Sequence, residues 1–154
     1  MELNYHVNQV VKFMNNAGQE TPDTLATPSP EQRILRAKLI LEEAFELINK
    51  GLGVNVYSSD VSVAPLTVGQ LDYQIVSDTD IVEAMDGAAD LFWVGVAGVS
   101  IIFGCELEPV LEEVNKSNAS KFIDGYRRED GKWVKGPSYK PAEIKAVIHD
   151  RVPF

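Results

Sequence analysis

Two acidic clusters, about forty positions apart, have the residue types and spacing for metal and phosphate chemistry. The first is Glu42-Glu43-x-x-Glu46 and the second is Asp86-x-x-x-Asp90. Residues three or four positions apart lie on one face of a helix, so the carboxylates within each cluster would repel one another. A cation between the two faces would relieve this repulsion, above all if both faced an apolar interior. Oxygen ligands suit hard divalent ions, so the clusters predict a Mg²⁺ site and phosphate chemistry.

Two helices are expected to carry these clusters. The first should begin at Ser29-Pro30, with Ser29 as N-cap and Gln32 completing a capping box, and should end at Gly51. The second should begin near Asp80 and run to about Phe103, before Gly104. Residues 91–103 are apolar on every side, which predicts a helix buried all round, at the centre of a bundle or in a subunit interface.

The remaining segments complete a predicted all-α fold, a four- to five-helix bundle with a small β insert. Further helices are expected at 4–16, 108–118 and 141–148, and a tight turn at Asp130-Gly131. In the insert, residues 51–77, alternation predicts a hairpin of 54–56 with 61–63 and another extended piece at 72–75. The length of 154 residues favours one domain spanning 1–154.

The distribution of charge separates an acidic middle from a basic tail. The net charge is −9, which argues against a nucleic-acid-binding protein. Residues 51–115 hold eleven Asp and Glu but no Lys or Arg, whereas residues 116–145 hold eight Lys and Arg. An anionic substrate would therefore approach as a metal complex, with the basic tail on its phosphates. The alternative is an ordinary solvated acidic surface.

Other features predict a soluble, cytoplasmic protein without a membrane anchor. The chain has no run of eighteen uncharged apolar residues, and its first residues lack the pattern of a signal peptide. Its one cysteine, Cys105, is expected to be a small buried apolar residue. With only His6 and His149 available, a zinc site is not expected.

Each candidate residue also has a structural interpretation. Glu42 could belong to an exposed acidic stripe. Asp86 and Asp90 are harder to explain structurally, because Asp is a poor helix former and the small residues around Gly87 would let a helix or a phosphate approach. Glu83 could complete a capping pair with Asp80 or bind metal. Trp93 could pack in the core or stack on a base.

The order and spacing of three motifs resemble those of a known superfamily. These motifs are LRAKLILEEAFEL at 35–47, DGAADLFWV at 86–94, and SNASK at 117–121 with DGKWVKGP at 130–137. Together they are similar to the all-α nucleoside triphosphate pyrophosphohydrolases. This MazG-like superfamily also holds phosphoribosyl-ATP pyrophosphohydrolases and dimeric dUTPases. The resemblance covers most of the chain.

The resemblance implies a helical, oligomeric enzyme that cuts a nucleoside triphosphate to the monophosphate and pyrophosphate. The family binds Mg²⁺ through an E-x-x-E helix and an E-x-x-D helix. Glu43-x-x-Glu46 fits the first helix and Asp90 fits the second. The position three before Asp90 is Gly87 rather than Glu, so Asp86 is expected to take that role, and Glu83-x-x-Asp86 offers a second register.

The resemblance also implies the roles of individual residues. Glu43, Glu46, Asp86 and Asp90, with Glu83 as a further candidate, would hold Mg²⁺ or Mn²⁺, and Glu42 or Glu43 would act as general base. Phosphates would contact Asn118, Lys121, Lys132 and Lys135, and Trp93 is the candidate base-stacking residue. A homodimer or homotetramer is expected. Two alternatives stay open: a phosphoribosyl-ATP pyrophosphohydrolase, and a catalytically silent nucleotide-binding or helical interaction protein.

Overall fold

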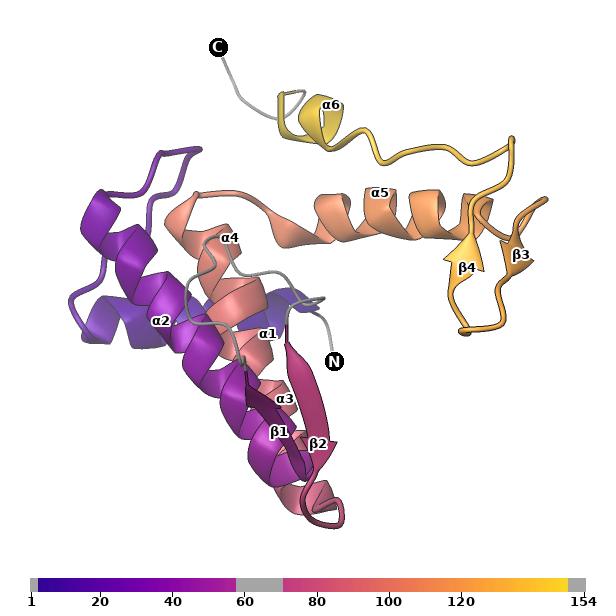
Figure 1. The fold of residues 1–154 in the computed structure, drawn as a ribbon. Helices are drawn as coiled ribbons and strands as arrows, with labels where there is room; N and C mark the ends of the chain where they lie inside the picture. Colours follow the sequence, from indigo (N-terminus) through magenta and orange to yellow (C-terminus); the bar gives the residue numbers. More distant parts are fainter. Residues whose placement is uncertain (1–2, 58–70, 150–154) are drawn as a thin grey trace. The chain divides into compact units, whose positions relative to one another are not determined.

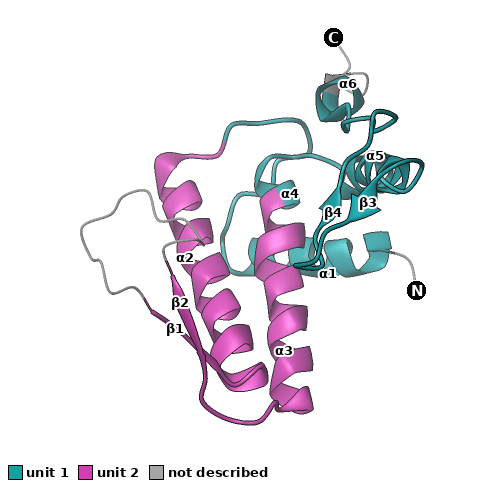
Figure 2. Ribbon diagram, turned by 45° about the vertical axis from the view of Figure 1, so that its right-hand side comes forward, with its two compact units in different colours: residues 1–27, 100–154 teal, residues 28–99 magenta. Residues whose placement is uncertain are grey.

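The structure, a computed structural model, is mainly helical and describes residues 3–57 and 71–149. Two small antiparallel sheets of two strands each accompany the helices (Figure 1). The chain divides into two compact units, residues 28–99 and residues 1–27 with 100–154 (Figure 2). The predicted mainly helical class is confirmed, while the single-domain assignment stays a prediction.

The unit of residues 28–99 is built on two antiparallel helical segments. The first contains α2 (Pro30–Glu46) and a π-helical turn, η1 (Leu47–Gly51). Its start matches the prediction: Gln32 N donates to Ser29 Oγ at 3.2 Å, and Ser29 N donates to Gln32 Oε1 at 2.8 Å. This reciprocal pair satisfies backbone donors that the first turn of a helix leaves without partners.

The second segment contains α3 (Ile81–Leu91), a second π-helical stretch η3 (Phe92–Ala97), and α4 (Gly98–Ile102), which leads into the other unit. Asp80 is the N-cap of α3, with Oδ1 accepting from Val82 N at 2.9 Å. The sequence predicted one regular helix here. The observed π-helix widens the turns beside α2, where the guanidinium of Arg36 fits against Gly98 and donates from Nη1 to Val94 O at 3.1 Å.

Small residues let the two segments pack closely. A Cβ at Gly87 would lie 3.0 Å from Leu47 Cα, and a Cβ at Gly51 would lie 2.5 Å from Ala84 Cα. The gap at Gly51 is too short for a side chain, and a side chain at Gly87 would force Leu47 to shift by a few tenths of an ångström, so these glycines set the separation of the helices. The crossing lies beside both acidic clusters and holds their backbones at a fixed distance.

The insert forms a hairpin with a different partner from the predicted one. Strand β1 (Val54–Tyr57) pairs antiparallel with β2 (Asp72–Ile75), with Val54 opposite Ile75 and Tyr57 opposite Asp72. The predicted partner at 61–63 lies outside the described residues. Strand pairing joins distant segments through backbone hydrogen bonds, and local alternation does not specify which segment is the partner.

The other unit contains α1 (Leu3–Asn16), α5 (Leu107–Ser120), the hairpin of β3 (Tyr126–Arg127) with β4 (Trp133–Val134), and α6 (Ile144–His149). Gly18 and Gly104 end helices at φ of +71° and +60°, as predicted. Gly131, at φ +83°, forms the expected turn. The chain after β4 returns along α5, where Lys140 N donates to Ser120 Oγ at 2.9 Å.

The apolar segment 91–103 is not buried on every side in the single chain, as the centre of a bundle would be, and the alternative of a subunit interface stays a prediction. Ala97, Ile101 and Ile102 are buried, but Val96 is 41% exposed and Phe103 is 38% exposed. One side of this helix is therefore open in the single chain. By length and composition alone, residues 81–102 could also cross a membrane, although a core helix of a soluble protein has the same composition. The absence of a membrane anchor stays a prediction.

Candidate metal and phosphate sites

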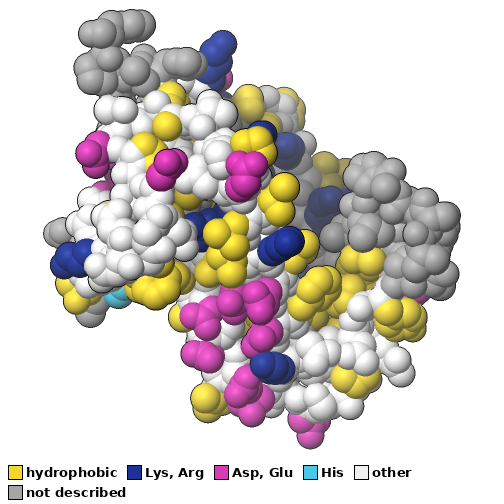
Figure 3. Space-filling model, turned by 90° about the vertical axis from the view of Figure 1, so that its left-hand side faces the viewer, with side chains coloured by type: hydrophobic (Ala, Val, Ile, Leu, Met, Phe, Trp, Pro, Cys, Tyr) yellow, Lys and Arg dark blue, Asp and Glu magenta, His cyan; other side chains and the backbone are white. Residues whose placement is uncertain are grey.

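Glu43 is the centre of the acidic face of the α2–α3 pair. Partial burial raises its pKa above the ordinary 4.5, and the negative charges of Asp90, Glu46, Glu42 and Asp86 raise it further. Carboxylates from both helices therefore act on one side chain, as the spacing predicted. Figure 3 shows Asp and Glu side chains gathered in one patch on the surface. An excess of carboxylates around a partly desolvated glutamate favours a cation.

This acidic face is open to solvent rather than turned into the core. Glu43 is half-buried, whereas Asp86, Asp90 and Glu42 are exposed. The acidic faces, for which an apolar interior was considered above, therefore do not face one in the single chain. The reason is that the residues between the helices are Ala84, Gly87 and Leu47, whose close packing leaves no room for acidic side chains. The carboxylates lie along the edge of the helix pair instead.

Glu46 has a partner that was not predicted. Its Oε2 lies 2.6 Å from Lys50 Nζ, and the hydrogen bond to Glu46 raises the pKa of Lys50. The two residues are one helical turn apart, an i, i+4 pattern that the sequence already contains. Within the described part of the chain, no three Asp, Glu, His or Cys side chains are gathered to hold a metal ion. A metal that used Glu46 would have to compete with the ammonium group of Lys50.

Asp80 caps α3, but the Glu83 side chain does not complete a capping pair with it. Asp80 Oδ1 accepts from the backbone N–H of Glu83 at 3.3 Å. The backbone N–H of Asp80 donates to Gly51 O at 2.9 Å, so it is not the partner of the Glu83 side chain. The reciprocal capping pair considered for Glu83 is therefore not formed. Glu83 is exposed on α3, three positions before Asp86.

Both acidic clusters end where the helix changes to a π-helix. Glu46 is the last residue of α2 before η1, and Asp90 lies two residues before η3. π-Helical turns cost hydrogen-bond geometry and are frequent at functional sites. Trp93, within η3, is half-buried. The sequence gives no sign of either π-helix, because each depends on packing against the opposite segment.

A separate basic cluster lies in the other unit, at the end of α5. Lys121 Nζ donates to Asn118 Oδ1 at 2.7 Å, and Lys135 Nζ lies 4.1 Å from the ring centroid of Tyr139. Ser117 Oγ donates to the Tyr139 hydroxyl at 3.3 Å. This bond lowers the pKa of Tyr139, and the charges of Lys135 and Lys121 lower it further. Among the described residues neither lysine forms an ion pair, so the cluster can accept an anion.

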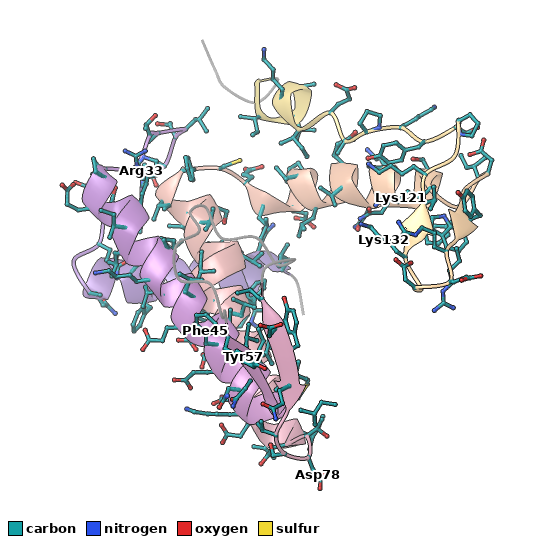
Figure 4. The ribbon with its side chains drawn as sticks, in the orientation of Figure 1. Arg33, Phe45, Tyr57, Asp78, Lys121 and Lys132 are labelled. Carbon is teal, nitrogen blue, oxygen red and sulfur yellow. The ribbon has the colours of Figure 1, made fainter. Side chains whose placement is uncertain are left out.

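Tyr139 and Ser117 were missed as members of this cluster. Tyr139 reaches α5 only because the chain reverses after β4, and sequence spacing does not predict that reversal. Lys132 is exposed on the β3–β4 hairpin and, like Lys121, is labelled in Figure 4. Trp133 fixes the hairpin to α5, with Nε1 donating to Lys121 O at 2.7 Å. Its ring centroid is 4.8 Å from that of Phe122.

Cys105 is half-buried rather than buried. It borders a hollow of about 490 Å³ and a second of about 680 Å³ in the unit of residues 1–27 and 100–154. Their charged lining is acidic, with Glu106 and Asp23 bordering both. Neither hollow therefore suits a phosphate, and the candidate sites remain the acidic face and the basic cluster.

Neither protein families nor curated proteins provide a relative of this chain. No protein-family model matches the chain, and no curated protein is significantly similar to it. The proposed function therefore rests on the geometry of the acidic face and the basic cluster, and on the motifs at 35–47, 86–94, 117–121 and 130–137.

Proposed function

We propose that the chain is a Mg²⁺-dependent pyrophosphohydrolase that converts a nucleoside or deoxynucleoside triphosphate to the monophosphate and pyrophosphate. The observation that carries the proposal is the raised pKa of Glu43, caused by burial and by carboxylates from both α2 and α3. Carboxylate oxygens are the ligands that Mg²⁺ prefers, and the negative charge gathered around Glu43 would attract the ion. We further propose the helical bundle of the all-α pyrophosphohydrolases as the fold, and clearance of unwanted nucleotides in the cytoplasm as the role.

The metal would be held by Glu43, Glu46, Asp86 and Asp90, with Glu83 as a further ligand and with Mn²⁺ as an alternative ion. These side chains fit the ion by their chemistry, because they supply oxygen donors with excess negative charge. They would have to turn toward one another, and Glu46 would have to leave Lys50. When bound, the ion would polarise the phosphates and lower the pKa of a water molecule.

The protein's own groups would handle the proton and the phosphates. Glu43 is the better candidate base, because burial and the neighbouring carboxylates raise its pKa and so strengthen it as a proton acceptor; Glu42 is the alternative. Lys121 and Lys135, with Asn118 and Lys132, would stabilise charge on the phosphates and on the leaving pyrophosphate. These phosphate-binding residues belong to the other unit. Trp93 would contact the nucleoside.

We also propose that the chain works as a homodimer or homotetramer. The open face of α3 and η3 includes Val82, Met85 and Val96, which are 72%, 59% and 41% exposed. A second copy would remove this apolar surface from water.

A catalytically silent nucleotide-binding protein is the second candidate. It is favoured by the Glu46–Lys50 ion pair, which neutralises one of the four proposed ligands, and by Gly87 at the position of the family's glutamate. A silent protein would bind nucleotide without releasing pyrophosphate.

One assay separates these possibilities. Purified protein is incubated with a panel of NTPs, dNTPs and phosphoribosyl-ATP, with Mg²⁺ or with excess chelator, and pyrophosphate release is measured. Metal-dependent release supports the enzyme, and the product nucleotide distinguishes a nucleoside triphosphate enzyme from a phosphoribosyl-ATP enzyme. Binding without release favours the silent protein, and release in excess chelator contradicts the metal site.

A further inference from the structure

A groove of about 300 Å³ lies in the unit of residues 28–99, between the end of α2 with η1 and strand β1. Its apolar lining includes Phe45, Ile48 and Val54, and its polar lining includes Asn49 and Asn55. Glu46 and Lys50 also border it. Phe45, at the α2 side of the groove, is labelled in Figure 4. None of the roles proposed above uses Phe45, Asn49 or Asn55.

The groove joins an aromatic surface to amide groups. The Phe45 side chain is 53% exposed, so its ring is accessible for stacking. The Asn49 amide nitrogen donates to Asn55 Oδ1, and within the described residues this is the only hydrogen bond that either amide makes. The Asn55 amide group keeps its N–H donors and Asn49 Oδ1 remains an acceptor. A donor and an acceptor next to an aromatic ring can bind the edge and face of a nucleobase.

The position of the groove relates it to the acidic face. Glu46 borders the groove and lies one helical turn after Glu43 on α2, on the same face of the helix. We propose that the groove binds the base of the nucleotide, with Phe45 stacking on the ring and Asn49 and Asn55 contacting its edge. This inference rests on the proposed function for its choice of ligand. It assigns base selection to the end of α2, η1 and β1, with Phe45 in place of Trp93 as the residue that stacks on the base.

The first test measures binding of nucleosides that carry no phosphate, in the absence of metal. NMR titration with adenosine, guanosine, cytidine and uridine would compare the wild type with Phe45→Ala. Loss of one stacking contact should weaken binding roughly 5- to 150-fold. Leu41→Ala is the matched control, because Leu41 is 57% exposed one turn earlier on α2 and does not line the groove. Absence of nucleoside binding by the wild type, or equal losses in both variants, would overturn the inference.

The second test exploits the amide pair. Asn55→Asp removes the N–H donors and leaves only acceptors. Guanosine and uridine, which present the carbonyl oxygens O6 and O4, should therefore lose affinity relative to adenosine and cytidine, which present the amino groups N6 and N4 at the same edge. Asn49→Asp keeps the acceptor but loses the hydrogen bond to Asn55 Oδ1, so it should weaken binding of all four nucleosides and change their ranking less. Circular dichroism checks that both variants fold, and an unaltered ranking in both would contradict the role of the amides.

These outcomes separate the groove from the catalytic proposal. Base-selective nucleoside binding that depends on Phe45, without release of pyrophosphate from any triphosphate, would support the groove and reject the enzyme. Pyrophosphate release with the same nucleotide ranking in the wild type, Phe45→Ala and Asn55→Asp would support the enzyme and reject the groove.

Discussion

Gly87 of α3 lies against the backbone of Leu47, so closely that a Cβ on the glycine would be 3.0 Å from Leu47 Cα. Leu47 is the residue after Glu46, and Gly87 is the residue after Asp86. The contact therefore sets how far apart the two acidic clusters can be. Removing it should change both the stability of the helix pair and its affinity for metal.

Gly87→Leu should destabilise the protein, because the side chain would push the two helices apart in a packed interface. Thermal unfolding would show a lower Tm, and calorimetric titration would show weaker Mg²⁺ binding. Gly95→Ala is the control: a Cβ there would meet Leu91 and Ile40 at 3.6 and 3.7 Å, which are ordinary contacts. Alanine should be neutral or stabilising there, by up to about 1 kcal/mol. Equal effects of the two changes would contradict the special role of Gly87.

Glu46→Gln and Asp90→Asn should each abolish pyrophosphate release while the protein stays folded. In Asp90→Asn, relief of carboxylate repulsion around Glu43 should leave the metal-free protein at least as stable as the wild type. Glu46→Gln also loses the exposed ion pair with Lys50, which contributes at most about 1 kcal/mol, so it should stay folded. Glu112→Gln, at an exposed position of α5, is the control and should keep full activity. Wild-type turnover in Glu46→Gln or Asp90→Asn would contradict the proposed metal site.

The raised pKa of Glu43 predicts how stability depends on pH without metal. The folded protein holds the Glu43 proton more tightly than the unfolded chain does. The contribution of this pKa shift to the free energy of unfolding is therefore fully present below the ordinary pKa of 4.5. It is lost as the pH rises through the pKa that Glu43 has in the folded protein. Thermal unfolding across this range should show the loss in the wild type and a smaller loss in Glu43→Gln. Identical pH profiles would contradict the prediction.

Mg²⁺ should restore that stability at neutral pH by binding the folded state. At one hundred times its Kd, a ligand specific for the folded state adds about 2.7 kcal/mol. A rise in Tm with Mg²⁺ at neutral pH, and none below the pKa of the carboxylates, is the expected result. No rise in Tm at any Mg²⁺ concentration at neutral pH would show that the acidic face does not bind the ion.

Lys121→Ala and Lys135→Ala should weaken transition-state binding by about 1 to 3 kcal/mol each, the range for charge-assisted contacts. The loss in kcat/KM should be similar for every base, because phosphates are common to all nucleotides. Lys132→Ala should act in the same direction. Lys145→Ala, an exposed position in the same basic tail, is the control. Unchanged kinetics in all three test variants would show that these lysines only keep the surface soluble.

Met85→Glu should convert an oligomer to a monomer, because it places a charge on the open apolar face of α3. Light scattering at micromolar concentration measures the mass. A wild-type monomer under these conditions would contradict the proposed assembly. Glu112→Gln, on the other unit, should leave the mass unchanged.

The features predicted correctly are those encoded by neighbouring residues. The capping box at Ser29, the cap at Asp80 and the glycine stops at Gly18 and Gly104 each depend on a few adjacent positions, and each is observed. The shared face of Glu43 and Glu46 follows from helical spacing in the same way. Local chemistry was therefore a sufficient guide to these helix ends, but not to the π-helical turns η1 and η3.

The features missed depend on contacts between distant segments. β1 pairs with β2 at Asp72–Ile75, and Tyr139 reaches Ser117 through a chain reversal. The exposure of Asp86 and Asp90 follows from the close packing of Gly87 on Leu47, which excludes their side chains from the interface. The Glu46–Lys50 ion pair is different, because its i, i+4 spacing is visible in the sequence and could have predicted the contact.

The register of β1 with β2 also has a consequence for how this protein could diversify. Tyr57 and Asp72 are paired across the hairpin, so the chain leaves the strand pair and re-enters it at neighbouring points. A segment attached at two adjacent anchors can be shortened, exchanged or lengthened at small entropic cost, since loop closure depends only weakly on length. The helices that carry the carboxylates need not move when this happens. The hairpin is thus a natural point at which related chains could gain or lose sequence between these strands without changing the α2–α3 packing.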